Sequence, residues 1–177
     1  MFELTDHKAK LTNVNPRAEL HGDQPKPAFD MMIEAACAST VLNDFHPELR
    51  AMLYKKDENP DLVEQVEGGD ALTALRMPKL GTLKWDAEGT GYTVTVDYGM
   101  GGDSNIVLAE CKVDKFKFTA QEGGTVTVQC RIIAHPDEKV IGPLCNFIQR
   151  DIILSITPPE PQNVHELFGE DASKKAA

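Results

Sequence analysis

The sequence predicts a mainly β protein, an antiparallel β-sandwich or a partly open barrel with two or three short helices, and three observations support this. Residues 92–98 alternate apolar and polar side chains with the period of two that is typical of a strand with one buried face. Glycine-rich turns follow several such runs at short intervals. The 177 residues, 41% of them hydrophobic, are enough to build one core. We therefore expect a single domain over residues 1–157 and a flexible tail at 158–177.

The first eighty residues carry the weaker patterns. Residues 8–14 and 28–36 are expected strands on either side of a polar, proline-rich turn. Ser39 is suited to begin a short helix that reaches Phe45, and Pro47 suits the first turn of a second helix. The second helix would present three apolar side chains on one face, namely Leu49, Met52 and Leu53. We expect both helices to cover one end or one side of the sheet.

The second half of the chain predicts five strands. The first two, 80–85 and 92–98, are expected to form a hairpin through a short polar turn. The next two, 105–118 and 125–134, form a longer hairpin, and a short helix leads from there to the last strand, 150–157. This last strand is a candidate sheet edge that a second subunit would cover, so the sequence leaves a homo-oligomer open.

An irregularity is predicted in the third of these strands. Its apolar positions are odd up to Val113 and even from Phe116 onward. One extra residue in a strand reverses the faces that follow it, so this change of parity predicts a bulge near Asp114 or Lys115.

The charge distribution limits the ligands that the protein can bind over a wide surface. There are 18 Lys and Arg residues against 28 Asp and Glu residues, which gives a net charge of −10. A protein that holds duplex DNA over a broad basic face is disfavoured, whereas a local basic groove is not. The acidic residues gather between Asp57 and Asp70, and several lysines gather on the strand 105–118. A solvated surface is the simplest interpretation of both clusters.

No pattern of catalytic or metal-ligating residues is found in the sequence. The histidines lack metal-binding spacing, and Cys37, Cys111, Cys130 and Cys145 are dispersed, which favours reduced core cysteines. The run at 99–102 is rich in glycine but lacks the Gly-Lys-Ser/Thr of a phosphate-binding loop. Nor is there a nucleophile elbow. We predict a protein that is not an enzyme, with no catalytic residue, no cofactor and no metal.

The expected location follows from the apolar runs. None approaches the length of about 20 residues that spans a bilayer. Residues 1–6 have neither the basic nor the apolar region of a secretory signal. We expect no membrane partner and a cytoplasmic location.

One candidate nucleic-acid site emerges from the strand pattern. Lysines that track a phosphate backbone beside aromatic rings that stack on bases are typical of single-strand binding. Residues of both kinds fall on neighbouring predicted strands: Lys112, Lys115 and Lys117, with Trp85 and Tyr92. A sheet also needs aromatic residues on its buried face and lysines on its wet face, which is the competing structural interpretation.

A second candidate site lies in the predicted tail. Gln162 begins a polar segment that ends in the apolar pair Leu167 and Phe168. An apolar pair on a flexible tail can dock in a partner's groove. The segment resembles, loosely, the peptides that bind bacterial sliding clamps, although it lacks the apolar residue expected soon after the glutamine. A tail that folds back on its own domain is the alternative.

Three segments carry a family resemblance. Residues 11–19 (LTNVNPRAE), 101–105 (GGDSN) and 122–126 (EGGTV) resemble uncharacterised proteins of tailed phages and prophages of proteobacteria. The resemblance implies expression in an infected bacterial cytoplasm beside replication, recombination or host-defence genes. It implies no site residue, because that group has no assigned mechanism.

These observations support three hypotheses. The first is a phage or prophage accessory protein that acts by binding single-stranded DNA, or a host or phage protein of DNA replication or recombination. The second is an inhibitor of a host or defence factor that uses the acidic segment 57–70 to imitate a phosphate backbone. The third is a structural protein of the virion, in its tail or capsid.

Overall fold

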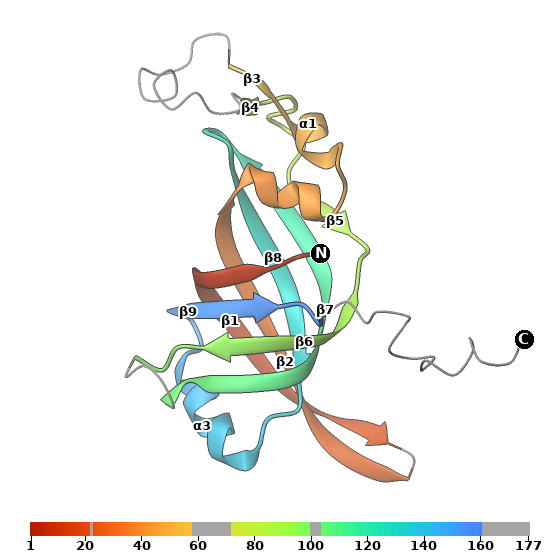
Figure 1. Ribbon diagram of the computed structural model, residues 1–177, viewed down its shortest axis with the longest axis vertical. Helices are drawn as coiled ribbons and strands as arrows, with labels where there is room; N and C mark the ends of the chain where they lie inside the picture. Colours follow the sequence, from red (N-terminus) through yellow and green to blue (C-terminus); the bar gives the residue numbers. More distant parts are fainter. Residues whose placement is uncertain (22, 58–71, 100–103, 161–177) are drawn as a thin grey trace, which may run out of the picture.

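The computed structural model describes residues 1–21, 23–57, 72–99 and 104–160, and its strands form a closed antiparallel barrel (Figure 1). The elements are, in chain order, β1 (Leu4–His21), β2 (Gln24–Ala38), η1 (Ser39–Asp44), α1 (Leu49–Leu53), β3 (Tyr54–Lys56), β4 (Leu72–Leu75), β5 (Leu83–Trp85), β6 (Gly89–Val96), β7 (Ile106–Gln121), β8 (Thr125–Ala134), α3 (Glu138–Asn146) and β9 (Arg150–Thr157). The mainly β prediction is confirmed, and of its two architectures the structure has the barrel.

Six strands close the barrel, and a seventh extends one wall. The order is β5-β7-β6-β9-β1-β2-β8, and β8 pairs again with β7 to complete the ring. β5 and β6 lie along the same side of β7: β6 pairs with Ile106–Val113 and β5 with Phe116–Phe118. The predicted hairpin between β5 and β6 is therefore wrong, because both strands use β7 as their partner. β9 lies between β6 and β1, so the predicted edge at Thr157 is wrong as well.

Alternating residues of the barrel strands fill its interior. On β8, Val126, Val128, Cys130 and Ile132 are at most 1% exposed. The residues that alternate with them from Thr125 to Arg131 are half-buried, which is the period of two expected for a wall with one wet face. Each fully buried aliphatic side chain contributes roughly 1.5–3 kcal/mol, so the barrel core is the main source of stability.

The N-terminal strands are longer than predicted. β1 and β2 pair from Ala9↔Ala35 to His21↔Gln24, and the far part of this hairpin projects beyond the barrel (Figure 1). The predicted strands 8–14 and 28–36 cover the part of the hairpin that carries buried residues. Leu20 is 77% exposed in the projecting part, which explains why the apolar pattern fades there.

Short helices lie at the two ends of the barrel, with η1 and α1 at one end and α3 at the other (Figure 1). Phe45, directly after η1, packs its ring against Phe116 and Phe118, with centroid distances of 4.8 and 4.7 Å. The predicted apolar face of α1 is correct for Leu49 and Leu53. It is wrong for Met52, which is 57% exposed, because one short helix buries too narrow a face to include it.

The bulge in β7 is confirmed. Pairing between β7 and β8 shifts register between Asp114 and Lys117. Lys115 has a φ of 54°, a left-handed conformation that L residues adopt at a cost. The extra residue lets Val113 and Phe116 both face the core.

Candidate functional site: a basic groove on β5 and β7

The pairing of β5 with β7 sorts apolar and basic side chains onto opposite faces. Leu83 pairs with Phe118, Lys84 with Lys117, and Trp85 with Phe116. Partners directly opposite in an antiparallel pair share a face. The buried Phe116 and Phe118 therefore define the inner face, and Lys84 and Lys117 lie side by side on the outer face.

This juxtaposition of two lysines is unfavourable without an anion. Like charges directly opposite each other on neighbouring strands destabilise a sheet. Within the described parts of the chain, no carboxylate lies within ion-pair distance of Lys84, Lys115 or Lys117. Lys112 differs, because its ammonium is 2.6 Å from a carboxylate oxygen of Glu88. Three cations of the β5–β7 wall are thus available to an external anion.

The bulge brings the third cation to the same place. Because Lys115 is the extra residue of the bulge, it leaves the regular alternation and lies next to the β5 pairing. The result is an open groove of about 350 Å³. We call it the basic groove and define it by its lining residues, which are Lys84, Trp85, Asp86, Lys115, Phe116 and Lys117.

Trp85 provides an aromatic surface at this groove. Its ring is half-buried, and its centroid lies 6.5 Å from the ring of His46 and 6.5 Å from the ring of Phe118. It also borders a second hollow, of about 150 Å³, that is lined by Phe45 and Tyr92 among others. The packing fixes the ring while part of it stays accessible, which is what a stacking platform requires.

The structure brings together three of the five predicted nucleic-acid residues. Trp85, Lys115 and Lys117 line the basic groove. Lys112 lies beyond the bulge and is paired with Glu88. Tyr92 is 4% exposed inside the barrel, where burial raises the pKa of its hydroxyl, so its ring offers no exposed surface for stacking. The alternation that predicted β6 already placed Tyr92 on its apolar face.

Three groove residues, Lys84, Asp86 and Phe116, were not among the predicted site residues. β5 has only three residues, too few to show a period, so nothing in the pattern indicated which way Lys84 faces. The signal was indirect, since a lysine between two apolar residues of a strand points away from the core.

Several sequence predictions lie outside the described residues. These are the tail residues Gln162, Leu167 and Phe168, and the acidic segment after Asp57.

The chemistry available at the site is binding of an anion and stacking on a ring. Across the described ranges, no group of three or more His, Cys, Asp and Glu residues is placed to hold a metal ion. Burial raises the pKa of the Cys37 thiol to about 11 and that of Cys111 to about 12, and it raises that of Cys130 as well. These three thiols are therefore protonated near neutral pH and are poor nucleophiles.

No described helix has the length and apolar character needed to cross a bilayer. Comparisons with protein families, with curated proteins and with solved structures find no match to this chain.

Proposed function

We propose that this chain is a non-enzymatic accessory protein that binds single-stranded DNA in the basic groove. The observation that carries the proposal is the cross-strand pair Lys84 and Lys117, two like charges held in register beside Trp85 without a carboxylate partner among the described residues. A phosphate placed between the two ammonium groups would remove their repulsion. The repulsion between the two lysines destabilises the free protein, and its relief adds to the free energy of binding.

Each groove residue has a distinct role in this proposal. Lys84 and Lys117 hold one phosphate, and Lys115 holds a neighbouring phosphate across the bulge. The accessible part of Trp85 stacks on a base, which is worth about 1–3 kcal/mol in single-strand binding proteins. Asp86 sets one boundary of the groove by repelling phosphate.

Single-stranded DNA fits the charge pattern better than duplex DNA does. The net charge of −10 gives no broad basic surface for a duplex, and base stacking needs a base that is free of its partner. The resemblance to phage and prophage proteins supports a setting in the bacterial cytoplasm beside replication or recombination genes, where single strands occur.

The proposal is tested by fluorescence anisotropy with labelled single-stranded and duplex oligonucleotides at low salt. We expect binding to the single strand, with log K falling against log salt at a slope of about −2 if three lysines displace counterions. Trp85 is the only tryptophan in the chain, so quenching of its fluorescence should follow the same curve. Absence of binding to the single strand would refute the proposal.

Variants locate the site on the protein. Lys84→Gln and Lys117→Gln should each weaken binding and reduce the salt slope by about 0.7. Neither should lower stability, since each relieves the repulsion in the free protein. The matched control is Lys139→Gln, an exposed lysine on α3 at the opposite end of the barrel, which should bind as the wild type does (Figure 1). Equal binding by all three variants would exclude the basic groove.

A further inference from the structure

The projecting part of the β1–β2 hairpin has an exposed apolar face. Partners directly opposite each other in an antiparallel pair share a face. Because Phe29 is buried in the core, its face of the hairpin continues the interior of the barrel. The pairs along this face are Pro16↔Phe29, Ala18↔Pro27 and Leu20↔Pro25, and all of these residues except Phe29 are exposed. Leu20, at 77%, is the most exposed large apolar side chain among the described residues.

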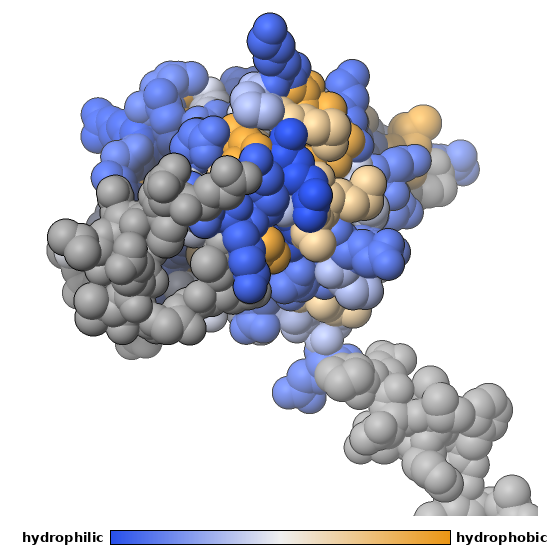
Figure 2. Space-filling view, turned by 90° about the horizontal axis from the view of Figure 1, so that it is seen from above, coloured by the Kyte–Doolittle hydropathy of each residue, from blue (hydrophilic) through white to orange (hydrophobic). Residues whose placement is uncertain are grey.

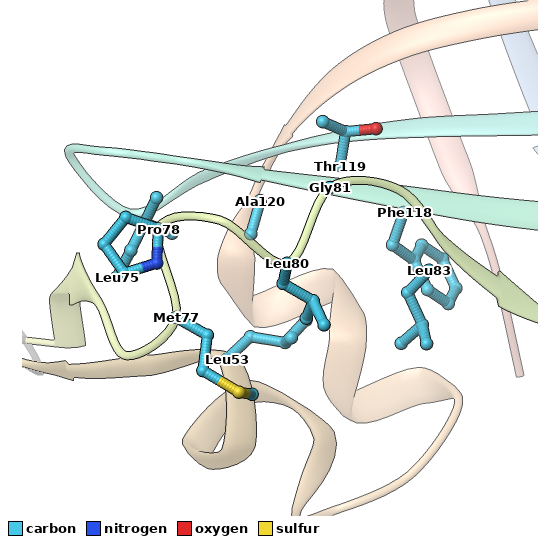
Figure 3. Close-up of a pocket in the computed structure, with 10 residues that line it drawn as sticks. All are labelled: Leu53, Leu75, Met77, Pro78, Leu80, Gly81, Leu83, Phe118, Thr119 and Ala120. Carbon is cyan, nitrogen blue, oxygen red and sulfur yellow. The ribbon is translucent and has the colours of Figure 1, made fainter.

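Apolar residues at the other end of the barrel have more cover. Met77 and Leu80 border a hollow of about 130 Å³, and Figure 3 shows their side chains beside Leu53 of α1. They are 48% and 45% exposed, so neighbouring atoms cover about half of each. Figure 2 shows hydrophilic side chains next to the apolar surface at this end. The apolar face of the projecting hairpin lacks such cover, which is typical of a surface that a partner completes.

Three prolines show which backbone groups point away from the hairpin. In an antiparallel pair, alternate residues turn their N–H and C=O groups toward the partner strand or away from it. Pro16, Pro25 and Pro27 all belong to one of these two sets. A proline has no N–H to give to a ladder, so it occupies strand positions that face away from the partner. Ala18 and Leu20 belong to the same set, and their N–H and C=O groups therefore point outward.

The two outer edges of the projecting hairpin differ in their capacity to pair. The edge of β2 has no donor at Pro25 or Pro27, which blocks it against a further strand. The edge of β1 has donors and acceptors at Ala18 and Leu20. Within the described residues, β9 pairs with β1 only from Leu4 to Leu11, and no other backbone group bonds to this edge beyond that pairing. Each chain thus has one open edge in the projecting hairpin.

The charges beside this open edge are self-complementary. Arg17 and Glu19 flank Ala18 on the other face of β1, where they form an ion pair with each other. Their side chains are 32% and 27% exposed, so both can reach a further strand. If two β1 strands lie antiparallel with Ala18 opposite Ala18, Arg17 of each copy faces Glu19 of the other. Moving the two-fold axis by one residue would set Arg17 opposite Arg17, or Glu19 opposite Glu19, which is unfavourable.

We propose that two copies of this chain associate through the outer edges of β1, in an antiparallel pair with Ala18 opposite Ala18. The two Ala18 residues exchange N–H···O=C bonds, and each Leu20 amide donates to the Pro16 carbonyl of the other copy. On the apolar face, each Leu20 lies beside Pro16 of the other copy, which shields it from water. The blocked β2 edges then lie outermost, so the assembly stops at two copies.

Sedimentation velocity of the full chain at about 1–500 µM tests the association. The strand pair buries less than the roughly 1,200–2,000 Å² of a standard interface, so we expect a reversible dimer that forms within this range. Ala18→Pro removes the central donor from the outer edge, where the hairpin itself does not use it. This variant should therefore stay monomeric and keep the wild-type thermal unfolding curve. A monomeric wild type, or a dimer of Ala18→Pro with wild-type affinity, overturns the proposal.

Exchange of charges tests the register of the two strands. Arg17→Glu sets carboxylates opposite each other in the dimer, and Glu19→Arg sets guanidinium groups opposite each other, so each variant alone should stay monomeric. In an equimolar mixture, the carboxylates of one variant face the guanidinium groups of the other, and a dimer should return. Its return also shows that both variants are folded. Absence of a dimer in the mixture overturns the proposed register and with it the proposal.

Leu80→Ser is the matched control at the other end of the barrel (Figure 3) and should dimerise as the wild type does. A dimer that dissociates in Leu80→Ser but survives in Ala18→Pro forms at that end and overturns the proposal. The basic groove is a separate surface, because β6 and β9 lie between β7 and β1. The result of the oligonucleotide titration is therefore independent of the result for the dimer.

Discussion

Arg131 on β8 and Asp114 on β7 form a bidentate ion pair: Nε of the arginine donates to Oδ1 of the aspartate at 2.8 Å, and Nη2 donates to Oδ2 at 2.7 Å. Arg131 also donates from Nη1 to Asp30 on β2 at 3.1 Å, and Asp30 accepts a hydrogen bond from Arg17 on β1 at 2.8 Å. The outer face thus carries a chain of ion pairs across four barrel strands.

Replacing Asp114 tests the energetic contribution of this pair. Asp114 is 8% exposed, so loss of its charge leaves Arg131 with a weaker partner in a poorly solvated place. We expect Asp114→Asn to lower the free energy of unfolding by about 1–3 kcal/mol at pH 7, measured by urea denaturation. Asp151→Asn is the control, because the exposed pair of Asp151 with Lys8 should contribute nothing measurable.

The same pair predicts a pH dependence of stability. Burial alone would raise the pKa of Asp114, but the hydrogen bonds and charge of Arg131 outweigh it and hold the pKa below its ordinary value of 3.8. The carboxylate therefore stabilises the fold above pH 4 and loses this effect as the pH falls through its depressed pKa. The difference between wild type and Asp114→Asn should narrow below about pH 4. A difference in the free energy of unfolding between the two proteins that stays constant down to pH 2 would contradict this prediction.

Tyr54 links β3 to the β7–β8 hairpin. It is fully buried, and its hydroxyl donates to the Thr125 carbonyl and accepts a hydrogen bond from the Gln121 amide at 3.2 Å. Tyr54→Phe leaves both backbone groups without this partner, so we expect a loss of about 1–3 kcal/mol in urea denaturation. Tyr98→Phe, at a ring that is 38% exposed, should change the free energy of unfolding by less than about 0.5 kcal/mol.

Gly123 in the β7–β8 turn has a φ of 78° and open space around it. A side chain there would meet no neighbour, so the effect of substitution is that of backbone conformation alone. Gly123→Ala should cost about 1–2 kcal/mol. Gly123→Asn should cost less, because asparagine tolerates the left-handed region better. Thermal unfolding checks this order of stability, and equal stability of the two variants would contradict the left-handed conformation of Gly123.

The four cysteines should divide into one reactive thiol and three protected thiols. Cys145 is exposed, whereas Cys37, Cys111 and Cys130 are buried in the barrel, where burial raises their pKa values. Ellman's reagent should titrate a single thiol in the native protein and all four in denaturant. Cys145→Ser should abolish the native reaction, and rapid modification of a second thiol would show that the barrel opens.

The alternation of apolar and polar residues predicted which side chains face the core of the barrel better than it predicted which strands pair with one another. The parity change between Val113 and Phe116 located the bulge at Lys115, because a period of two fixes the face of each side chain. The same pattern carries no information on which strand lies alongside which. The predicted hairpin of β5 with β6 was wrong for this reason. Both strands pair with β7 instead: Gly89, at the start of β6, pairs with Val113, and Trp85, at the end of β5, pairs with Phe116.

Only part of the candidate site was predicted, because the sequence pattern shows the face of a residue within a strand but not its partner on another strand. Lys115, Lys117 and Trp85 were found because they belong to patterned segments, and the structure gathers them in one groove. Lys84 became part of the site only through its register with Lys117, a relationship between distant residues.

The pairing of β1 with β9 has a consequence for how the barrel is made. The first and last strands of the ring are neighbours, with Leu4 opposite Ile156. A chain that emerges from its N-terminus exposes the hydrogen-bonding edge of β1 until Thr157 has been synthesised. Contacts between residues so far apart in sequence slow folding, typically to milliseconds or seconds. During that interval the nascent chain is vulnerable to aggregation, and a chaperone that shields β1 would act in this window.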